Sequence, residues 1–174
     1  MSDTPANGGE NAQAQAPALA INGQYIKDLS FEAPNSPGIL SELQNQQPDV
    51  NVNVDVNAAK LEGADNVYEV TLDMRSELKL GDKVGFLVEL KYAGVFSVNV
   101  PEEHLGPILL IECPRMLFPF ARNIIADATR DGGFVPLLLQ PIDFTGMYQA
   151  NVAQQAEQTA NKIADELAEP KGNA

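Results

Sequence analysis

The sequence has a single cysteine, Cys113, and a single histidine, His104. One cysteine excludes an intrachain disulfide, and the two residues together are too few for a protein zinc site. Catalysis needs an acid–base pair or an activated nucleophile, and neither residue has such a partner in the sequence. Cys113 precedes a proline that opens a helix, where the dipole could lower its pKa, but burial is the better interpretation. We expect a cytoplasmic protein that is not an enzyme, with no catalytic residues, metal or cofactor.

Basic residues are scarce, with 11 lysines and arginines against 24 acids and a net charge of −13. Phosphate binding depends on lysine and arginine, and aromatic residues, at 6% of the chain, are too few for a base-stacking platform. The sequence therefore indicates no nucleic-acid partner. A basic protein partner is the electrostatic complement, although the acidity could also serve only to keep the chain soluble.

Long uninterrupted hydrophobic runs are absent. The apolar residues between 105 and 148 are divided by Gly132-Gly133 and by five prolines: Pro107, Pro114, Pro119, Pro136 and Pro141. No segment approaches the roughly 18 apolar residues of a membrane span, so we expect no direct membrane insertion. Residues 1–21 are small and polar, lack the pattern of a secretory signal and are expected to form a disordered tail.

Alternation of apolar and polar residues is the strongest structural pattern. It runs through residues 49–57, 68–80 and 84–92, with a turn at Gly81-Asp82 and a strand end expected at Ala93-Gly94. A shorter segment, residues 25–31, is expected to be an edge strand. These segments predict a four-stranded antiparallel sheet with one apolar face and one face open to water.

Helical patterns follow the predicted strands. We expect a first helix over residues 102–113 that Pro107 kinks or splits, and a second from Pro114 to Gly132-Gly133. Residues 134–141 read as an extended apolar connector, and Asp143 as the N-cap of a last helix over residues 144–168. The predicted fold is α+β, with helices on the apolar sheet face. The domain spans residues 22–150, followed by a C-terminal helix and frayed tail over 151–174.

Apolar residues between 105 and 148 exceed the needs of one small core. Phe118, Phe120, Phe134, Phe144 and Tyr148 are each either core residues or contributors to oligomer contacts and adaptable apolar grooves. Leu87 is a separate exception, because it lies on the charged face beside Glu89. It is either an ordinary exposed leucine or the anchor of an acidic docking patch.

Two long motifs occur in order along the chain. Residues 25–35 read Tyr-Ile-Lys-Asp-Leu-Ser-Phe-Glu-Ala-Pro-Asn, and residues 113–122 read Cys-Pro-Arg-Met-Leu-Phe-Pro-Phe-Ala-Arg. Gly132-Gly133-Phe134 and the Pro-Ile-Asp-Phe of residues 141–144 follow them. From about residue 24 to 148 the sequence resembles the SecB family, the protein-export chaperones of proteobacteria.

The resemblance implies a homotetramer, built as a dimer of dimers with helices inside and sheets outside. It implies an ATP-independent holdase that keeps unfolded presecretory proteins translocation-competent in the cytosol and delivers them to the SecA motor. The positions matching the acidic patch for the basic, zinc-binding tail of SecA are Asp28, Glu32, Leu87 and Glu89. The positions matching client binding and assembly are Phe86, Val88, Leu90, Tyr92, Leu117, Phe118, Phe120, Ile124 and Phe134. The alternative is a SecB-like adaptor or antitoxin-stabilising chaperone with a dedicated client.

Overall fold

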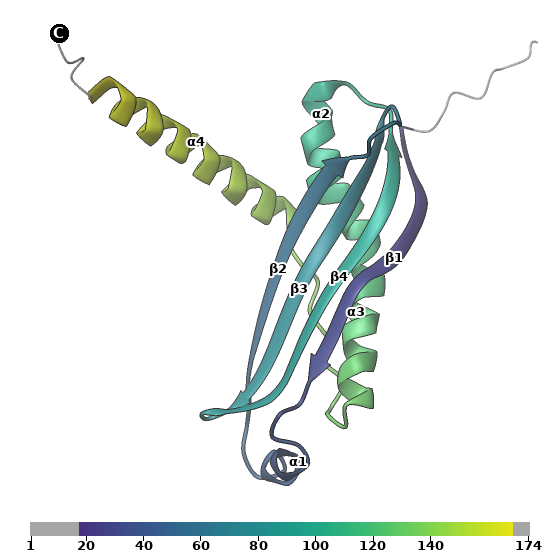
Figure 1. The fold of residues 1–174 in the computed structure, drawn as a ribbon, viewed down its shortest axis with the longest axis vertical. Helices are drawn as coiled ribbons and strands as arrows, with labels where there is room; N and C mark the ends of the chain where they lie inside the picture. Colours follow the sequence, from purple (N-terminus) through teal and green to yellow (C-terminus); the bar gives the residue numbers. More distant parts are fainter. Residues whose placement is uncertain (1–17, 169–174) are drawn as a thin grey trace, which may run out of the picture.

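The structure, a computed structural model, describes residues 18–168 and the side chains of residues 18–162. Four strands and a helical layer make up the fold (Figure 1). The strands are β1 (Leu19–Glu32), β2 (Asp49–Lys60), β3 (Val67–Leu80) and β4 (Lys83–Val98). The helices are α1 (Gly38–Glu42), α2 (Glu102–Pro107), the π-helical segment η1 (Ile108–Glu112), α3 (Cys113–Asp131) and α4 (Phe144–Ala168).

The sheet is antiparallel throughout, in the order β1-β4-β3-β2. The first two strands in sequence therefore form its two edges, and the segment containing α1 carries the chain from one edge to the other. The α+β class, the antiparallel sheet and the edge position of residues 25–31 are confirmed.

Two predicted strand limits are wrong. β1 begins at Leu19, inside the predicted tail, and β4 continues through Ala93-Gly94 to Val98. Gly94 pairs with both neighbouring strands and packs closely, since a Cβ there would lie 2.7 Å from Leu117 Cδ2. Gly94 thus permits a close approach between the sheet and α3, and does not end the strand.

One face of the sheet, here called the inner face, carries the core. Side chains of β3 and β4 on this face are buried, as the alternating pattern predicts: Val70, Leu72, Met74, Leu78, Phe86, Val88, Leu90 and Tyr92. They pack against fully buried residues of α3, including Leu117, Ala121 and Ile125. Burying one such aliphatic side chain contributes about 1.5–3 kcal/mol, so this contact dominates the stability of the chain.

The helical layer runs behind the sheet in Figure 1, from α2 down along α3. The predicted split occurs at Pro107, the last residue of α2, where the chain passes through five π-helical residues before α3 begins at Cys113. Gly132 follows the last residue of α3, and Gly133 has a positive φ of 89°. The predicted helix stop at the glycine pair is confirmed.

The last helix, α4, projects away from the body (Figure 1). Asp143 caps its start as predicted, because the Gly146 N–H donates to Asp143 Oδ1 at 3.0 Å. Phe144 anchors it in an edge-on contact with Phe118, with ring centroids 6.0 Å apart. From residue 149 to 162 every side chain is exposed. Within residues 18–168 no helix has both the length and the apolar content to cross a membrane.

Most of the predicted surplus of aromatic residues is core. Phe118, Phe134 and Phe144 are buried, whereas Phe120 is 49% exposed. The apolar residues left exposed lie instead mainly on the two edge strands, on one side of α3 and on the connector: Ile21, Tyr25, Ile26, Leu29, Val50, Val52, Met116, Phe120, Val135, Leu138 and Val152. The apolar side chains that one core cannot accommodate are therefore present, and most of them are aliphatic.

Candidate binding surfaces

The four residues predicted to dock a partner lie on the outer face, the sheet face that α3 does not cover. Glu32 of β1 is directly opposite Leu87 of β4, and Asp28 is opposite Lys91. Glu89 lies between these pairs, opposite Ser30. Side chains on directly opposite residues of one face are roughly 5 Å apart, so the four form one group. We call Asp28, Glu32, Leu87 and Glu89 the outer patch.

The carboxylates of the outer patch differ in their surroundings. Arg75 of β3 donates a hydrogen bond to Glu89 across the strand pair. The side-chain carboxylates of Asp28 and Glu32, in contrast, make no ion pair or hydrogen bond with any residue in the described part of the chain. The patch therefore holds two open carboxylates and one that is already paired. The sequence alone gave no indication of this pairing.

A second ionic group lies further along the same face. Lys27 Nζ donates to Glu69 at 2.6 Å, and the Tyr25 hydroxyl donates to the same carboxylate. These two hydrogen bonds, from Lys27 first and Tyr25 second, lower the pKa of Glu69, and the bond to Glu69 raises the pKa of Tyr25. The irregular pairing of β1 between Ile26 and Asp28 places Lys27 there.

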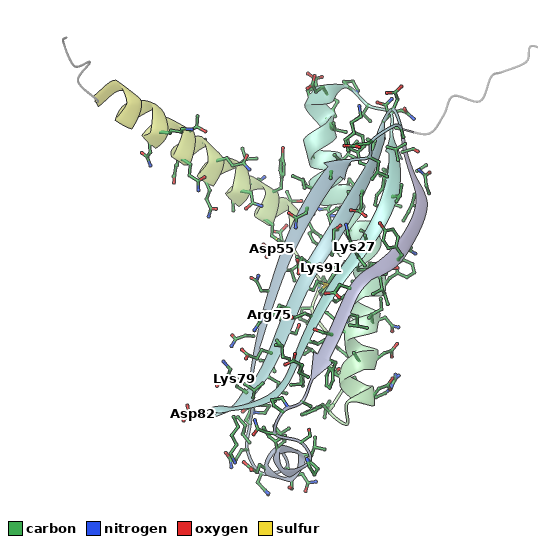
Figure 2. All side chains as sticks on the ribbon, in the orientation of Figure 1. Lys27, Asp55, Arg75, Lys79, Asp82 and Lys91 are labelled. Atoms are coloured by element: carbon green, nitrogen blue, oxygen red, sulfur yellow. The ribbon has the colours of Figure 1, made fainter. Side chains whose placement is uncertain are left out.

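Acids outnumber bases on the outer face. Labelled charges in Figure 2 run along the sheet from Lys27 and Lys91 to Arg75 and Lys79. Lys83 is not on this face, because the irregular pairing after Leu78 places it opposite Leu80, where it forms an ion pair with Glu42 of α1 at 2.7 Å. The acids are Asp28, Glu32, Asp49, Asp55, Glu69, Asp73, Glu77 and Glu89; the bases are Lys27, Arg75, Lys79 and Lys91.

Most residues predicted to bind clients belong to the core. Those buried are Phe86, Val88, Leu90, Tyr92, Leu117, Phe118 and Phe134. In this packing they are not accessible on the surface of the chain, because α3 and the sheet cover one another. Only Phe120 is exposed, and Ile124 is partly buried. The accessible apolar surface near these positions is instead the segment that follows α3.

This segment, residues 132–143, is called the connector. It has no regular secondary structure, and Val135 and Leu138 are 87% and 62% exposed. Its start is fixed by an aromatic cluster in which the Phe134 ring lies 5.1 Å from Phe86 and 6.3 Å from Phe31. The buried Thr129 hydroxyl then accepts a hydrogen bond from the Leu137 N–H at 3.0 Å.

Two open grooves flank the connector. The first has a volume of about 470 Å³ and is lined by Leu40, Leu43, Gln44, Pro48, Leu78, Gly133, Phe134 and Val135. The second has a volume of about 510 Å³ and is lined by Val52, Val54, Leu139, Gln140, Ile142 and Met147. Both linings are mostly apolar. The exposed Val52 and the partly buried Val54 of β2 therefore line a groove, a role that sequence reasoning did not assign to them.

A further apolar strip joins β1 to α3. Phe120 stacks on Tyr92 with ring centroids 6.5 Å apart, and Ile26 lies opposite Tyr92 in the β1–β4 pairing. Leu29 shares this side of β1, and Met116 precedes Phe120 by one helical turn. The exposed residues Ile26, Leu29, Met116 and Phe120 are called the helix-side strip. A strip of this kind typically meets another protein surface.

Cys113 and His104 form no reactive site in the described residues. Cys113 is fully buried, and burial raises the pKa of its thiol to about 12. The burial predicted for Cys113 is therefore confirmed, and the alternative, a pKa lowered by the helix dipole, is not supported. His104 is exposed and lies 3.5 Å from Glu103. Across the side chains of residues 18–162 no three His, Cys, Asp or Glu residues group as metal ligands.

Sequence comparisons agree on one family. The family model described as preprotein translocase subunit SecB matches residues 12–155. A protein-export protein SecB of Rhodospirillum rubrum is 53% identical over 164 residues, covering 94% of this chain and 98% of that protein. Its counterpart in Paramagnetospirillum magneticum is 55% identical over 142 residues, covering 82% and 90%.

A solved structure shares the fold. The SecB-like chaperone of Mycobacterium tuberculosis, in complex with an antitoxin peptide, superposes with a TM-score of 0.60. The match covers 72% of this chain and 91% of that chain at 13% sequence identity. At this identity the likeness concerns the fold alone.

Proposed function

Because the chain belongs to the SecB family of preprotein translocase subunits, we propose that separate surfaces of it bind the different partners of a protein-export chaperone. Family membership makes it a chaperone in protein export, which binds preproteins and the export machinery. We propose that the chaperone acts in the cytoplasm and does not use ATP.

The two grooves beside the connector are proposed to hold unfolded clients. The observation that carries this assignment is an exposed apolar segment, Val135 to Leu138, standing between two apolar grooves of about 470 and 510 Å³. Apolar burial, at roughly 25 cal/mol per Å², supplies affinity without reading a sequence. A chaperone that binds the unfolded form withdraws it from folding by mass action, so nucleotide hydrolysis is not required.

The outer patch is proposed to dock the basic, zinc-binding tail of SecA. Two of its carboxylates, Asp28 and Glu32, are open to a cationic partner, and Leu87 supplies an apolar contact directly opposite Glu32. Charges on an open face steer association and weaken with added salt. This docking is separated from the grooves by the thickness of the sheet.

The helix-side strip is proposed to be buried when the chain assembles as a dimer of dimers. Phe120, 49% exposed on α3, stands beside the free edge strand β1, so helix and strand can be covered together. A tetramer would also place several pairs of grooves along one client. A long unfolded chain that engages more than one subunit gains avidity from tethering.

The holding function is tested by refolding kinetics. We expect the purified chain, without nucleotide, to delay the refolding of a chemically unfolded precursor in proportion to chaperone concentration. Unrelated precursors should be delayed as well, and delay of a single dedicated client would favour the adaptor alternative. A native protein diluted under the same conditions should be unaffected. Unchanged refolding of every precursor at saturating chaperone would contradict the proposal.

A further inference from the structure

We propose that Arg75 competes with the docking partner for Glu89. By pairing with Glu89, Arg75 sets how tightly a cationic segment binds the outer patch. The inference rests on the docking function proposed above. It adds a specificity-determining residue that lies outside the four residues of the patch.

The pairing of Arg75 and Glu89 is direct and accessible. The two residues are opposite one another in the β3–β4 register, and Arg75 Nη1 donates to Glu89 Oε1. Their side chains are 52% and 43% exposed, so the ion pair stands in water on the open face. Exposed pairs of this kind contribute little to stability. A partner can therefore displace Arg75 without loosening the fold.

Arg75 pairs with only one of the three carboxylates of the outer patch. The carboxylates of Asp28 and Glu32 have no ion pair or hydrogen bond in the described residues, while the carboxylate of Glu89 is held by the guanidinium of Arg75. A lysine or arginine of the partner must exchange with Arg75 to reach Glu89. Because the guanidinium offers the carboxylate the same kind of charge-assisted hydrogen bond that a partner's arginine would, the two compete for one acceptor.

The neighbouring ion pairs do not obstruct the patch in this way. Lys79 pairs with Glu77 at 3.1 Å and Lys91 pairs with Asp73 at 3.5 Å, and neither acid belongs to the patch. Lys79 shares both the strand and the face of Arg75. Neutralising Lys79 thus removes the same charge but frees no patch carboxylate. It provides the matched control for Arg75.

The test measures binding of a synthetic, zinc-loaded peptide with the basic C-terminal sequence of SecA to the full chain at low salt. Arg75→Gln should tighten binding about two- to five-fold, the range expected when one exposed ion pair no longer competes. Lys79→Gln should tighten it less, through net charge alone. In a Glu89→Gln background, Arg75→Gln should have no more effect than Lys79→Gln.

Two failures are distinguishable. If Arg75→Gln matches Lys79→Gln or weakens binding while the wild-type chain binds the peptide, Arg75 is not a competitor and the inference is overturned. If the wild-type chain binds no peptide, or if Asp28→Asn with Glu32→Gln leaves the affinity unchanged, the docking function itself fails and the inference fails with it. Thermal unfolding of each variant verifies that the fold is intact.

Discussion

The two faces of the sheet carry different kinds of side chain, apolar on the inner face and charged on the outer face. In our account they also have different functions. On β4, Leu90 faces inward and is fully buried, while Leu87, three residues earlier, faces outward and is only partly buried. The inner face is closed by α3 through apolar contacts, and the outer face is an open array of ion pairs. Stability is concentrated on the inner face and the proposed SecA docking on the outer face, so substitutions on the two faces should have separable effects.

The largest expected effect is on the inner face. Leu90→Ala should lower the free energy of unfolding by about 2–5 kcal/mol, because it leaves a cavity among fully buried residues. Leu87→Ala, the same change on the same strand, should cost about 1 kcal/mol or less. Urea unfolding at one fixed protein concentration compares them, since assembly contributes to the measured stability. Equal losses of unfolding free energy in the two variants would contradict the claim that stability is concentrated on the inner face.

The next effect concerns assembly. Phe120→Asp places a charge on the helix-side strip and should convert a species near four times the 18.7 kDa chain mass into smaller ones in light scattering. Val135→Asp is the matched control, since it places the same charge at an exposed apolar residue of the connector. It should leave the mass unchanged. A tetramer that survives Phe120→Asp would show that this strip is not the contact.

The smallest effect lies on the outer face, at Glu69. The lowered pKa of Glu69 means that its stabilising contribution is present above the ordinary carboxyl value of 4.5 and is lost as the pH falls through the lower folded value. Glu69→Gln should therefore destabilise the chain by under about 1 kcal/mol at neutral pH, and the difference should vanish in acid. Thermal melts of both proteins across this pH range measure it. A difference that persists or grows in acid would contradict the assigned ion pair with Lys27.

Alternation of side chains was sufficient to predict most of the sheet. Period-two patterns located β2, β3 and β4, because a half-buried strand must place every second residue in the core. Gly94 was misjudged, since its role depends on Leu117, which lies far along the sequence. The start of β1 was missed for a related reason: an edge strand with irregular pairing carries no clean alternation.

The outer patch was predicted only through the family resemblance, together with the unusual position of Leu87. Its internal pairing could not be predicted, because many acids and bases share one face and only the strand register decides which are opposite. Arg75 and Glu89 are 14 residues apart in sequence and become partners through the β3–β4 pairing. The grooves could not be predicted either, because the second of them forms only where connector residues lie beside Val52 and Val54 of β2.

The division between faces is tested most directly by measuring SecA binding and client holding side by side on two kinds of variant, one on the outer patch and one in the connector. Leu87→Gln should abolish or strongly weaken SecA binding and leave the delay of precursor refolding intact, and Glu89→Lys should behave alike. The double variant Val135→Asp with Leu138→Asp should lose the delay and still bind SecA. Loss of both activities in either variant, with the fold intact, would contradict the assignment of docking to one sheet face and holding to the other.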